Sequence, residues 1–390
     1  AALGGAENVA SPLAESLRDA GSVVVVWGER IVREGDAAAG ALLELAAALN
    51  VAGADGAGLL EVPDFANARG LREAGCLPDA GPGLSAADPG MSSEEIRAAL
   101  ESGELGALVL FGVDPLRDFP DTPAWEAALT AAEFVVSFSM FETQTSGKAN
   151  VVFPLESHAE KDGTVTHPDG RLQRVRPSAS RPGDIRPNFQ VLAELSTALG
   201  HDTGITSQPT AFAALTQAVP FYSAITEESI GGRGIRWQDT QASANVPSAS
   251  ESAGGASERF AREENGAIGD SSTAPQRRVA SEEAPPALSL ALGTYRDLWA
   301  GPITELNPPL KFLAPEQRVE VSLADADRLN LSSGDTVKVA QNGSSVNARV
   351  LIRERMSDGV CFLSEGTAAN NANALLNGGP VSVEITKVEA

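Results

Sequence analysis

Short apolar runs alternate with segments of helical periodicity through the first two hundred residues, and this alternation constrains the fold more than any other feature. Residues 22–27 contain four consecutive valines and end at Gly28, and residues 36–49 place Ala and Leu at helical spacing. A continuous apolar run of this length is typical of a strand buried on both faces of a parallel sheet. The same order continues in helix 92–102, strand 107–111, helix 122–132, strand 134–138, strand 150–153 and helix 189–199. This order predicts an α/β domain with a doubly wound parallel sheet.

Local signals mark where these helices begin and end. Ser92 and Glu95 have the spacing of a capping box before one helix, and Asn188 is expected to cap the helix that Gly200 closes. Ligands of doubly wound sheets bind beyond the carboxyl ends of the strands. We therefore expect Gly28, residues 112–115 and residues 139–147 to share one rim.

A different pattern of short strands begins at Arg318. The Asn342-Gly343 pair is a strong hairpin signal between two of these strands. We expect a small β-barrel with one short helix. Residues 240–287 are rich in Ser, Ala, Glu and Gly and contain few large apolar side chains, which predicts a linker. The predicted division is an α/β domain over 1–202, an extension and linker over 203–314, and a barrel domain over 315–390.

Charge and cysteine content exclude several classes of function. The formal net charge is −23, and such a surface repels phosphate backbones, so we do not expect nucleic-acid binding. No apolar run approaches the ~20 residues of a membrane-spanning helix, and no secretory leader is recognisable, so we expect a soluble cytosolic chain. The chain does not start with Met and is expected to be a fragment or a processed form. Its two cysteines cannot supply the four ligands of an iron–sulfur cluster, and no zinc-type spacing is present.

A cassette at residues 150–177 carries the clearest candidate site. After an apolar run come Glu160, Lys161 and Gly163, then a turn at 168–170, and then a basic run that contains Arg171, Gln173, Arg174 and Arg176. Turns of this kind, with carboxylate, amide and guanidinium groups between them, suit a loop that holds a polar, anionic ligand. The alternative is an ordinary surface loop, which the local chemistry alone favours.

The cassette and its neighbours resemble the molybdopterin oxidoreductase superfamily. Within it they are most similar to the G subunit family of bacterial NADH-quinone oxidoreductase (respiratory complex I). The matching stretches are FGVDP (111–115), ANVVFP (149–154), EKDGT (160–164), DGRLQR (169–174) and RPNFQVLAEL (186–195). The resemblance covers about 20–200 and is absent from about 203–290. It is weaker over 315–388, where it includes NANAL (371–375) and implies a double-psi-like barrel.

The resemblance implies a pterin dinucleotide site that this chain has lost. In cofactor-binding members the late domains grip the dinucleotide, at positions that correspond here to Gly112, Asp114, Glu160, Lys161, Gly163, Arg171 and Gln173. Four positions depart from the family pattern: Ser139 replaces Asp, Gln144 replaces Glu, Asn150 replaces Asp, and His167 replaces Asn. A neutral side chain makes a weaker hydrogen bond than a carboxylate. We therefore expect the retained residues to be structural remnants, with no catalytic residue, metal ligand or cofactor in this segment.

By this resemblance the segment would support the iron–sulfur electron-transfer arm of complex I. The clusters would lie in N-terminal sequence outside this chain, and its partners would be other subunits of the peripheral arm on the inner face of the bacterial membrane. Two alternatives stay open. One is an active molybdenum or tungsten oxidoreductase, such as a formate dehydrogenase-like chain that binds the pterin, and the other is a stand-alone binding module. Cluster-type cysteine spacing upstream would favour the scaffold, and a single metal-ligating Cys the active enzyme.

Overall fold

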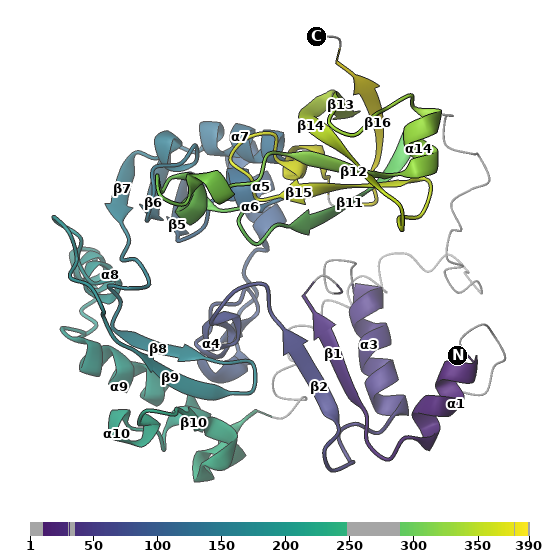
Figure 1. Ribbon diagram of the computed structural model, residues 1–390. Coiled ribbons are helices and arrows are strands. Elements are labelled where there is room, and N and C mark those ends of the chain that lie inside the picture. Colours follow the sequence, from purple (N-terminus) through teal and green to yellow (C-terminus); the bar gives the residue numbers. More distant parts are fainter. Residues whose placement is uncertain (1–10, 30, 32–35, 248–288, 378, 389–390) are drawn as a thin grey trace, which may run out of the picture. The chain divides into compact units, whose positions relative to one another are not determined.

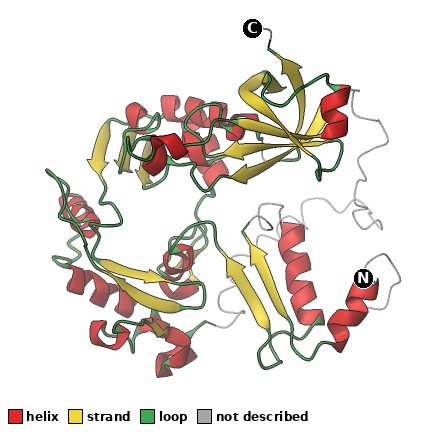
Figure 2. Ribbon diagram, viewed as in Figure 1, coloured by secondary structure: helices red, strands yellow, loops and turns green. Residues whose placement is uncertain are grey.

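The computed structural model describes residues 11–29, 31, 36–247, 289–377 and 379–388 (Figure 1). They belong to two units, and each unit joins two stretches that are distant in sequence. The first unit comprises residues 1–90 and 156–267, and the second comprises residues 91–155 and 268–390. Figure 2 shows that helices and strands occur in both.

The valine run forms the first strand of the first unit, as predicted, but this strand is not buried, because Val24 and Val26 are 54% and 61% exposed. Strand β1 (Val24–Gly28) pairs in parallel with β2 (Gly58–Val62), and α3 (Asp36–Ala48) connects them. Leu42 and Ala46 of α3 are buried. Helix α1 (Ser11–Asp19) precedes this strand–helix–strand element.

The cassette forms a hairpin in the same unit. Strands β8 (Gly163–Thr166) and β9 (Arg171–Val175) are antiparallel, and β10 (Ile235–Arg236) adds to the free edge of β9. The helical elements around this sheet are α4 (Ala68–Glu73), α8 (Asn188–Ala198), α9 (Gln208–Ala218), α10 (Glu227–Ile230) and the 3-10 turns η4 (Pro220–Tyr222), η5 (Trp237–Asp239) and η6 (Gln241–Asn245). A short hairpin of β3 (Ala80–Gly81) and β4 (Ser85–Ala86) flanks the 3-10 turn η2 (Pro82–Leu84).

Residues 203–247 are part of this core. Leu172 of β9 is fully buried in a cluster whose other members all come from this stretch: Phe212, Val219, Phe221, Tyr222, Ile225, Ile230 and Trp237. Burial of these large apolar side chains stabilises the stretch against β9. The extension is therefore folded up to residue 247, whereas most of the predicted linker at 240–287 lies outside the described residues.

The second unit begins with a three-stranded parallel sheet. Strands β5 (Ala107–Phe111), β6 (Phe134–Ser139) and β7 (Val151–Pro154) pair in that order. Helices α5 (Ser93–Ser102), α6 (Pro115–Asp118) and α7 (Thr122–Ala131) and the turn η3 (Ser146–Lys148) complete this part. Both hydrogen bonds of the predicted Ser92–Glu95 capping box are present.

The structure corrects the expectation of one shared rim. Gly28 ends β1 in a two-stranded sheet, whereas residues 112–115 follow β5 in a separate three-stranded sheet. The predicted cap at Asn188 is also wrong. The helix begins at Asn188, and the Asn188 side chain instead accepts a hydrogen bond from the Glu156 backbone N–H at 3.2 Å. Both features depend on partners distant in sequence, which a local pattern does not identify.

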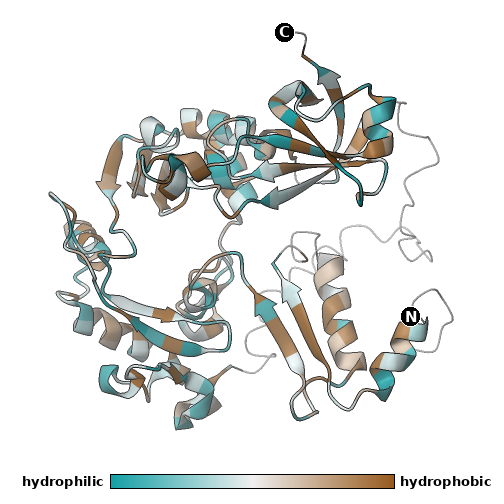
Figure 3. Ribbon diagram, viewed as in Figure 1, coloured by the Kyte–Doolittle hydropathy of each residue, from teal (hydrophilic) through white to brown (hydrophobic). Residues whose placement is uncertain are grey.

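A closed six-stranded barrel completes the second unit, as predicted. Its strands are β11 (Ser289–Arg296), β12 (Arg318–Ser322), β13 (Thr336–Gln341), β14 (Ser344–Arg353), β15 (Val360–Glu365) and β16 (Ser382–Lys387). The parallel pairs β11–β15 and β12–β14 give it a double-psi-like arrangement. Alternate residues of β13 are buried, and alternation of hydropathy is visible along the barrel strands (Figure 3). The predicted hairpin joins β13 to β14 through Asn342 and Gly343, both with positive φ.

The barrel takes its first strand from residues that the sequence pattern placed in the extension. Strand β11 lies before residue 315 and pairs with both β15 and β16, so it closes the barrel. Helices α13 (Pro302–Glu305) and α14 (Leu323–Arg328) and the turns η7 (Lys311–Leu313) and η8 (Ala372–Leu375) connect the strands. Nowhere in the described ranges is a helix long and apolar enough to cross a membrane.

Candidate functional site

A cavity of about 450 Å³ lies within the second unit at the carboxyl ends of β5 and β6. The loop after β5 contributes Asp114 and Arg117, and the loop after β6 contributes Glu142 and Gln144. Glu305 of α13 and the barrel segments 345–346 and 367–371 line the opposite parts. This is the rim position at which open α/β sheets bind ligands.

The barrel loop that contains NANAL holds α6 in place. The side-chain amides of Asn371 and Asn373 each donate a hydrogen bond to the backbone carbonyl of Arg117, at 2.8 Å. The Asp121 backbone N–H donates to the Asn373 carbonyl at 3.0 Å. These bonds fix the backbone from which the Arg117 side chain enters the cavity.

Arg117 and Glu305 form a largely buried ion pair in this cavity. The Arg117 Nη2 atom lies 2.7 Å from Glu305 Oε1, and the two side chains are only 10% and 13% exposed. The Ala368 backbone N–H donates to the same oxygen at 3.4 Å. The other carboxylate oxygen, Glu305 Oε2, is buried and has no hydrogen-bond partner among the described residues.

The charges that line the cavity are mostly negative. Asp114, Glu142 and Glu305 supply three carboxylates against the single guanidinium of Arg117, a formal charge of −2. Asp114 also accepts a hydrogen bond from the Thr145 hydroxyl. Burial raises the pKa of the adjacent Asp118 carboxyl, because Arg296 only partly offsets the lost solvation and the Asp114 charge adds to it.

The structure brings two of the predicted site residues to this cavity. Gly112 follows β5 with a φ of 67°, and its backbone N–H donates to the Phe138 carbonyl at 2.9 Å. Asp114 lines the cavity itself. The other five predicted residues, Glu160, Lys161, Gly163, Arg171 and Gln173, lie in the first unit, in and beside the β8–β9 hairpin.

Within the cassette, the predicted residues mostly stabilise turns and strand ends. Glu160 accepts a hydrogen bond from the Ser157 backbone N–H at 2.8 Å, which closes the loop before β8. Gly163 pairs with Val175, Gln173 pairs with Val165, and a Cβ at position 163 would meet open space. Lys161 makes no hydrogen bond or ion pair with any residue in the described part of the chain.

Asp169 organises the second turn of the cassette. Its Oδ1 atom accepts a hydrogen bond from the Arg171 backbone N–H at 3.0 Å and lies 2.9 Å from His167 Nδ1. Burial acts to raise the pKa of Asp169, but these hydrogen bonds outweigh it and hold the pKa below its usual value. Arg174 of β9 is tied to Glu227 in the extension by an ion pair of 2.7 Å.

The four positions that depart from the family pattern have different surroundings. The Ser139 hydroxyl donates to the Phe141 carbonyl at 2.6 Å, and Gln144 lines the cavity. His167 lies on the exposed turn of the cassette. Asn150 precedes β7, at the opposite end of the sheet from the cavity, and its Oδ1 accepts the Val135 N–H at 2.7 Å. An Asp could accept that bond equally well, so the change at this position is not informative about a ligand.

Sequence reasoning missed the residues that dominate the cavity. Arg117 follows the matched FGVDP stretch by only two positions. The motif therefore indicated the right region of the sequence but not the role of Arg117. Glu305 lies in the range assigned to the extension and linker, where no motif drew attention to it. Its significance comes from a contact with Arg117 across 188 positions of sequence.

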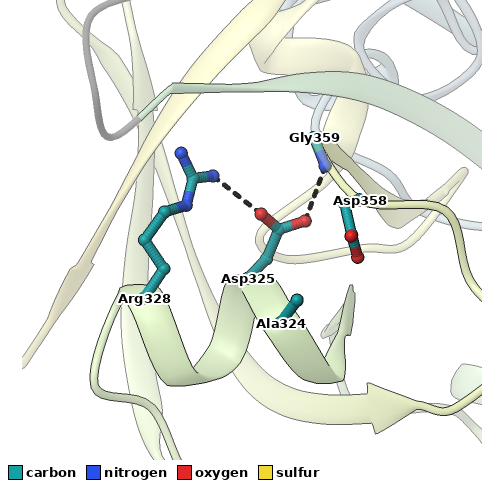
Figure 4. A pocket seen from close by; sticks show the side chains of 5 residues that line it. All are labelled: Ala324, Asp325, Arg328, Asp358 and Gly359. Carbon is teal, nitrogen blue, oxygen red and sulfur yellow. Dashed lines mark hydrogen bonds and ion pairs between the residues drawn. The ribbon is translucent and has the colours of Figure 1, made fainter.

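A second, smaller hollow lies on the barrel beside α14, lined by Ala324, Asp325, Arg328, Asp358 and Gly359 (Figure 4). Asp325 accepts hydrogen bonds from Arg328 and from the Gly359 backbone N–H, both at 2.7 Å. Both of its oxygens are thus occupied by the protein, which indicates a structural role. In the described ranges no cluster of three or more His, Cys, Asp and Glu side chains is arranged to hold a metal ion.

Two family models match most of the chain. The model described as molybdopterin oxidoreductase matches residues 6–198, and the model described as molydopterin dinucleotide binding domain matches residues 290–387. Among solved structures, acetylene hydratase from Pelobacter acetylenicus has a TM-score of 0.55 at 13% identity, over 76% of this chain and 46% of that one. This likeness concerns the fold alone.

Curated relatives with different names also match. NADPH-Fe(3+) oxidoreductase subunit alpha of Geobacter sulfurreducens is 27% identical over 382 residues, 94% of this chain and 41% of its own length. The NADH-quinone oxidoreductase G subunit of Streptomyces coelicolor is 36% identical over 189 residues, 43% of this chain and 21% of its own length. F420-dependent formate dehydrogenase 2 subunit alpha of Methanococcus maripaludis is 26% identical over 350 residues, 83% of this chain and 50% of its own length. The chain thus spans half or less of the length of these relatives.

Proposed function

The chain belongs to the molybdopterin oxidoreductase family, and from this premise we propose that it is a non-catalytic segment of the G subunit of an NADH-quinone oxidoreductase (respiratory complex I). In this role it is a scaffold for an iron–sulfur electron-transfer arm. It retains the family fold and has no redox centre of its own. Its partners are other subunits of the peripheral arm, and the complex lies on the inner face of the bacterial membrane.

The observation that carries this proposal is the charge of the cavity at the rim of β5 and β6. A pterin dinucleotide contains a diphosphate, which proteins hold with guanidinium groups and backbone N–H donors. Here three carboxylates face one guanidinium, and that guanidinium is already bound to Glu305. The residues present therefore do not fit a diphosphate, and we derive no chemical step through a pterin.

Sequence similarity supports the assignment to a G subunit. Of the relatives described above, the Streptomyces coelicolor protein has the highest identity, 36%, over its matched region. Two positions near the cavity, Ser139 and Gln144, carry neutral side chains where the family pattern has carboxylates. The change at Asn150 adds no support because its side chain bonds to the backbone of β6.

A second candidate is an active pterin-dependent oxidoreductase. It is supported by the Methanococcus relative, which is named as a formate dehydrogenase subunit and matches 83% of this chain. Under this alternative Asp114 and the residues around it would contact the dinucleotide.

The test is the cofactor content of the full-length subunit purified from its source. Molybdenum and tungsten are measured by mass spectrometry, pterin by fluorescence after oxidation, and iron and sulfide by standard assays, with a formate dehydrogenase prepared in parallel as a positive control. The scaffold predicts iron and sulfide without molybdenum, tungsten or pterin. Stoichiometric metal together with a dinucleotide pterin would refute the scaffold and establish the alternative.

A further inference from the structure

The contact between Arg117 and Glu305 resembles an occupied anion-binding site, in which the Glu305 carboxylate is the bound anion. The Arg117 guanidinium and the Ala368 backbone N–H both point to one oxygen, Glu305 Oε1, at 2.7 Å and 3.4 Å. A guanidinium together with a backbone N–H is also the donor set with which proteins bind phosphate. The occupant in this case is a carboxylate from the chain itself.

The donor side of this contact is held rigidly. The amide side chains of Asn371 and Asn373 both donate to the Arg117 carbonyl, so the backbone of α6 is fixed relative to the barrel loop. The Arg117 side chain is also largely buried. A donor fixed in this way loses little conformational entropy when it binds an anion.

The acceptor side is incomplete. A buried carboxylate is stabilised when both oxygens accept hydrogen bonds, yet Glu305 Oε2 has no partner within the part of the chain that the structure describes. The carboxylate therefore satisfies the donors of Arg117 and Ala368 while leaving one of its own oxygens unpaired. The Arg117–Glu305 pair is therefore not fully satisfied, so the donors of the site offset the burial of the Glu305 carboxylate only in part.

We propose that Glu305 occupies an anion site formed by Arg117 and the Ala368 backbone N–H, and that removal of the Glu305 carboxylate opens this site to a phosphate group. The proposal deepens the proposed function and rests on it in taking the cavity to be free of pterin. According to this proposal, the Glu305 carboxylate prevents the cavity from binding a diphosphate. It also gives Glu305 a role that no motif in the sequence indicates.

The test is binding of inorganic pyrophosphate to the full 390-residue chain, measured by isothermal titration calorimetry at low ionic strength without divalent cations. Wild-type protein is expected to give no measurable binding. The Glu305→Ala variant is expected to bind at least about tenfold more tightly than the weakest binding that the assay detects, because a released charged donor contributes at least one power of ten. The Arg117→Ala, Glu305→Ala double variant is expected to lose this gain.

The chain offers a matched control in Glu142. This carboxylate lines the same cavity but makes no hydrogen bond or ion pair with Arg117, so Glu142→Ala removes the same charge without releasing the guanidinium. It is expected to bind pyrophosphate no better than wild type. Circular dichroism verifies the fold of each variant, and Glu305→Gln, which retains the side-chain volume, replaces Glu305→Ala if the latter does not fold.

Two outcomes would overturn the proposal. One is a folded Glu305 variant that binds pyrophosphate no more tightly than Glu142→Ala does. The other is wild-type protein that binds as tightly as the Glu305 variant, since Glu305 would then not occupy the site. Neither outcome changes what the cofactor analysis of the native protein would find. The proposed function is therefore tested by cofactor content, and the role of Glu305 is tested separately by pyrophosphate binding.

Discussion

Replacement of Tyr222 by Phe tests whether the extension at 203–247 holds the cassette in place. Tyr222 lies in η4 and is 1% exposed, and its hydroxyl donates a hydrogen bond to the buried carboxylate of Glu73 in α4. The same hydroxyl lies 3.1 Å from the Thr166 hydroxyl at the end of β8. Glu73 also accepts the indole N–H of Trp237 at 3.1 Å. One network thus joins α4, the cassette hairpin and the extension.

The expected cost follows from the loss of one charge-assisted hydrogen bond. Phe has nearly the same shape as Tyr, so the ring contact with Phe221 is retained and no large cavity forms. Glu73 is left with one buried oxygen that has lost its donor. A hydrogen bond to a charged group contributes roughly 1.5–3 kcal/mol, and we expect a loss of this size in the free energy of unfolding.

The assay is urea-induced unfolding followed by tryptophan fluorescence, and the matched control is Tyr295→Phe. These are the only two tyrosines in the sequence, and the Tyr295 side chain is partly exposed and makes no hydrogen bond to a described residue. We expect Tyr295→Phe to change stability by less than about 0.5 kcal/mol. Equal effects of the two substitutions, or a Tyr222→Phe effect below that threshold, would refute the network as the cause.

The pH dependence of stability provides an independent check on Tyr222. Burial, and then the nearby Glu73 charge, raise the pKa of Tyr222 above its ordinary value of about 10. The folded state therefore holds the phenolic proton more tightly than the unfolded state does. The stabilising contribution is complete below pH ~10 and is lost as the pH rises above that value. Tyr222→Phe is expected to reduce this alkaline decline, to which Tyr295 also contributes because burial raises its pKa, and an unchanged decline would contradict the assignment.

Three further predictions concern the second unit. Burial raises the pKa of Asp118, so the folded protein is less stable when this carboxyl is ionised than when it is protonated. Asp118→Asn removes the ionisation and is therefore expected to raise the urea midpoint at pH 7 more than at pH 3.5. A hydrogen bond from Lys387 lowers the pKa of Asp335, so the stability that the Asp335 carboxylate contributes is present at neutral pH and is lost on acidification. Asp335→Asn is therefore expected to lower the urea midpoint at pH 7 and to have less effect at low pH. If Asp118→Asn and Asp335→Asn change the midpoint in the same direction, this reasoning is refuted. Asn150→Asp is expected to leave the thermal midpoint nearly unchanged, whereas Asn150→Ala costs about 1 kcal/mol because the Val135 N–H loses its acceptor; a large loss in Asn150→Asp would show that the amide itself is required.

Features set by neighbouring residues were predictable from the sequence. The capping box of Ser92 and Glu95 closes within four residues, and the hairpin at Asn342-Gly343 needs only two residues that tolerate positive φ. The composition of the valine run is enough to predict that β1 is a strand. In each case the interactions that determine the structure lie within a short window, so pattern and structure agree.

Features set by distant partners were not predictable in the same way. Asn188 has the residue type of a helix cap, but its side chain bonds to the Glu156 backbone 32 positions earlier. Strand β11 lacks a local turn signal that would assign it to the barrel, and its place depends on pairing with β15 and β16 near the other end of the chain. Glu305 was missed for the same reason, because its importance arises only from its contact with Arg117.

Retention of the cassette does not by itself indicate a bound ligand, because the polar residues that shape its turns have partners within the protein. Glu160 closes a turn on Ser157, Asp169 closes the next turn on Arg171, and Arg174 reaches Glu227 in the extension. Substitution of any of these residues would disturb the hairpin whether or not a cofactor is bound. The proposal of an inactive member therefore rests on the rim of β5 and β6, where three carboxylates face the single guanidinium of Arg117.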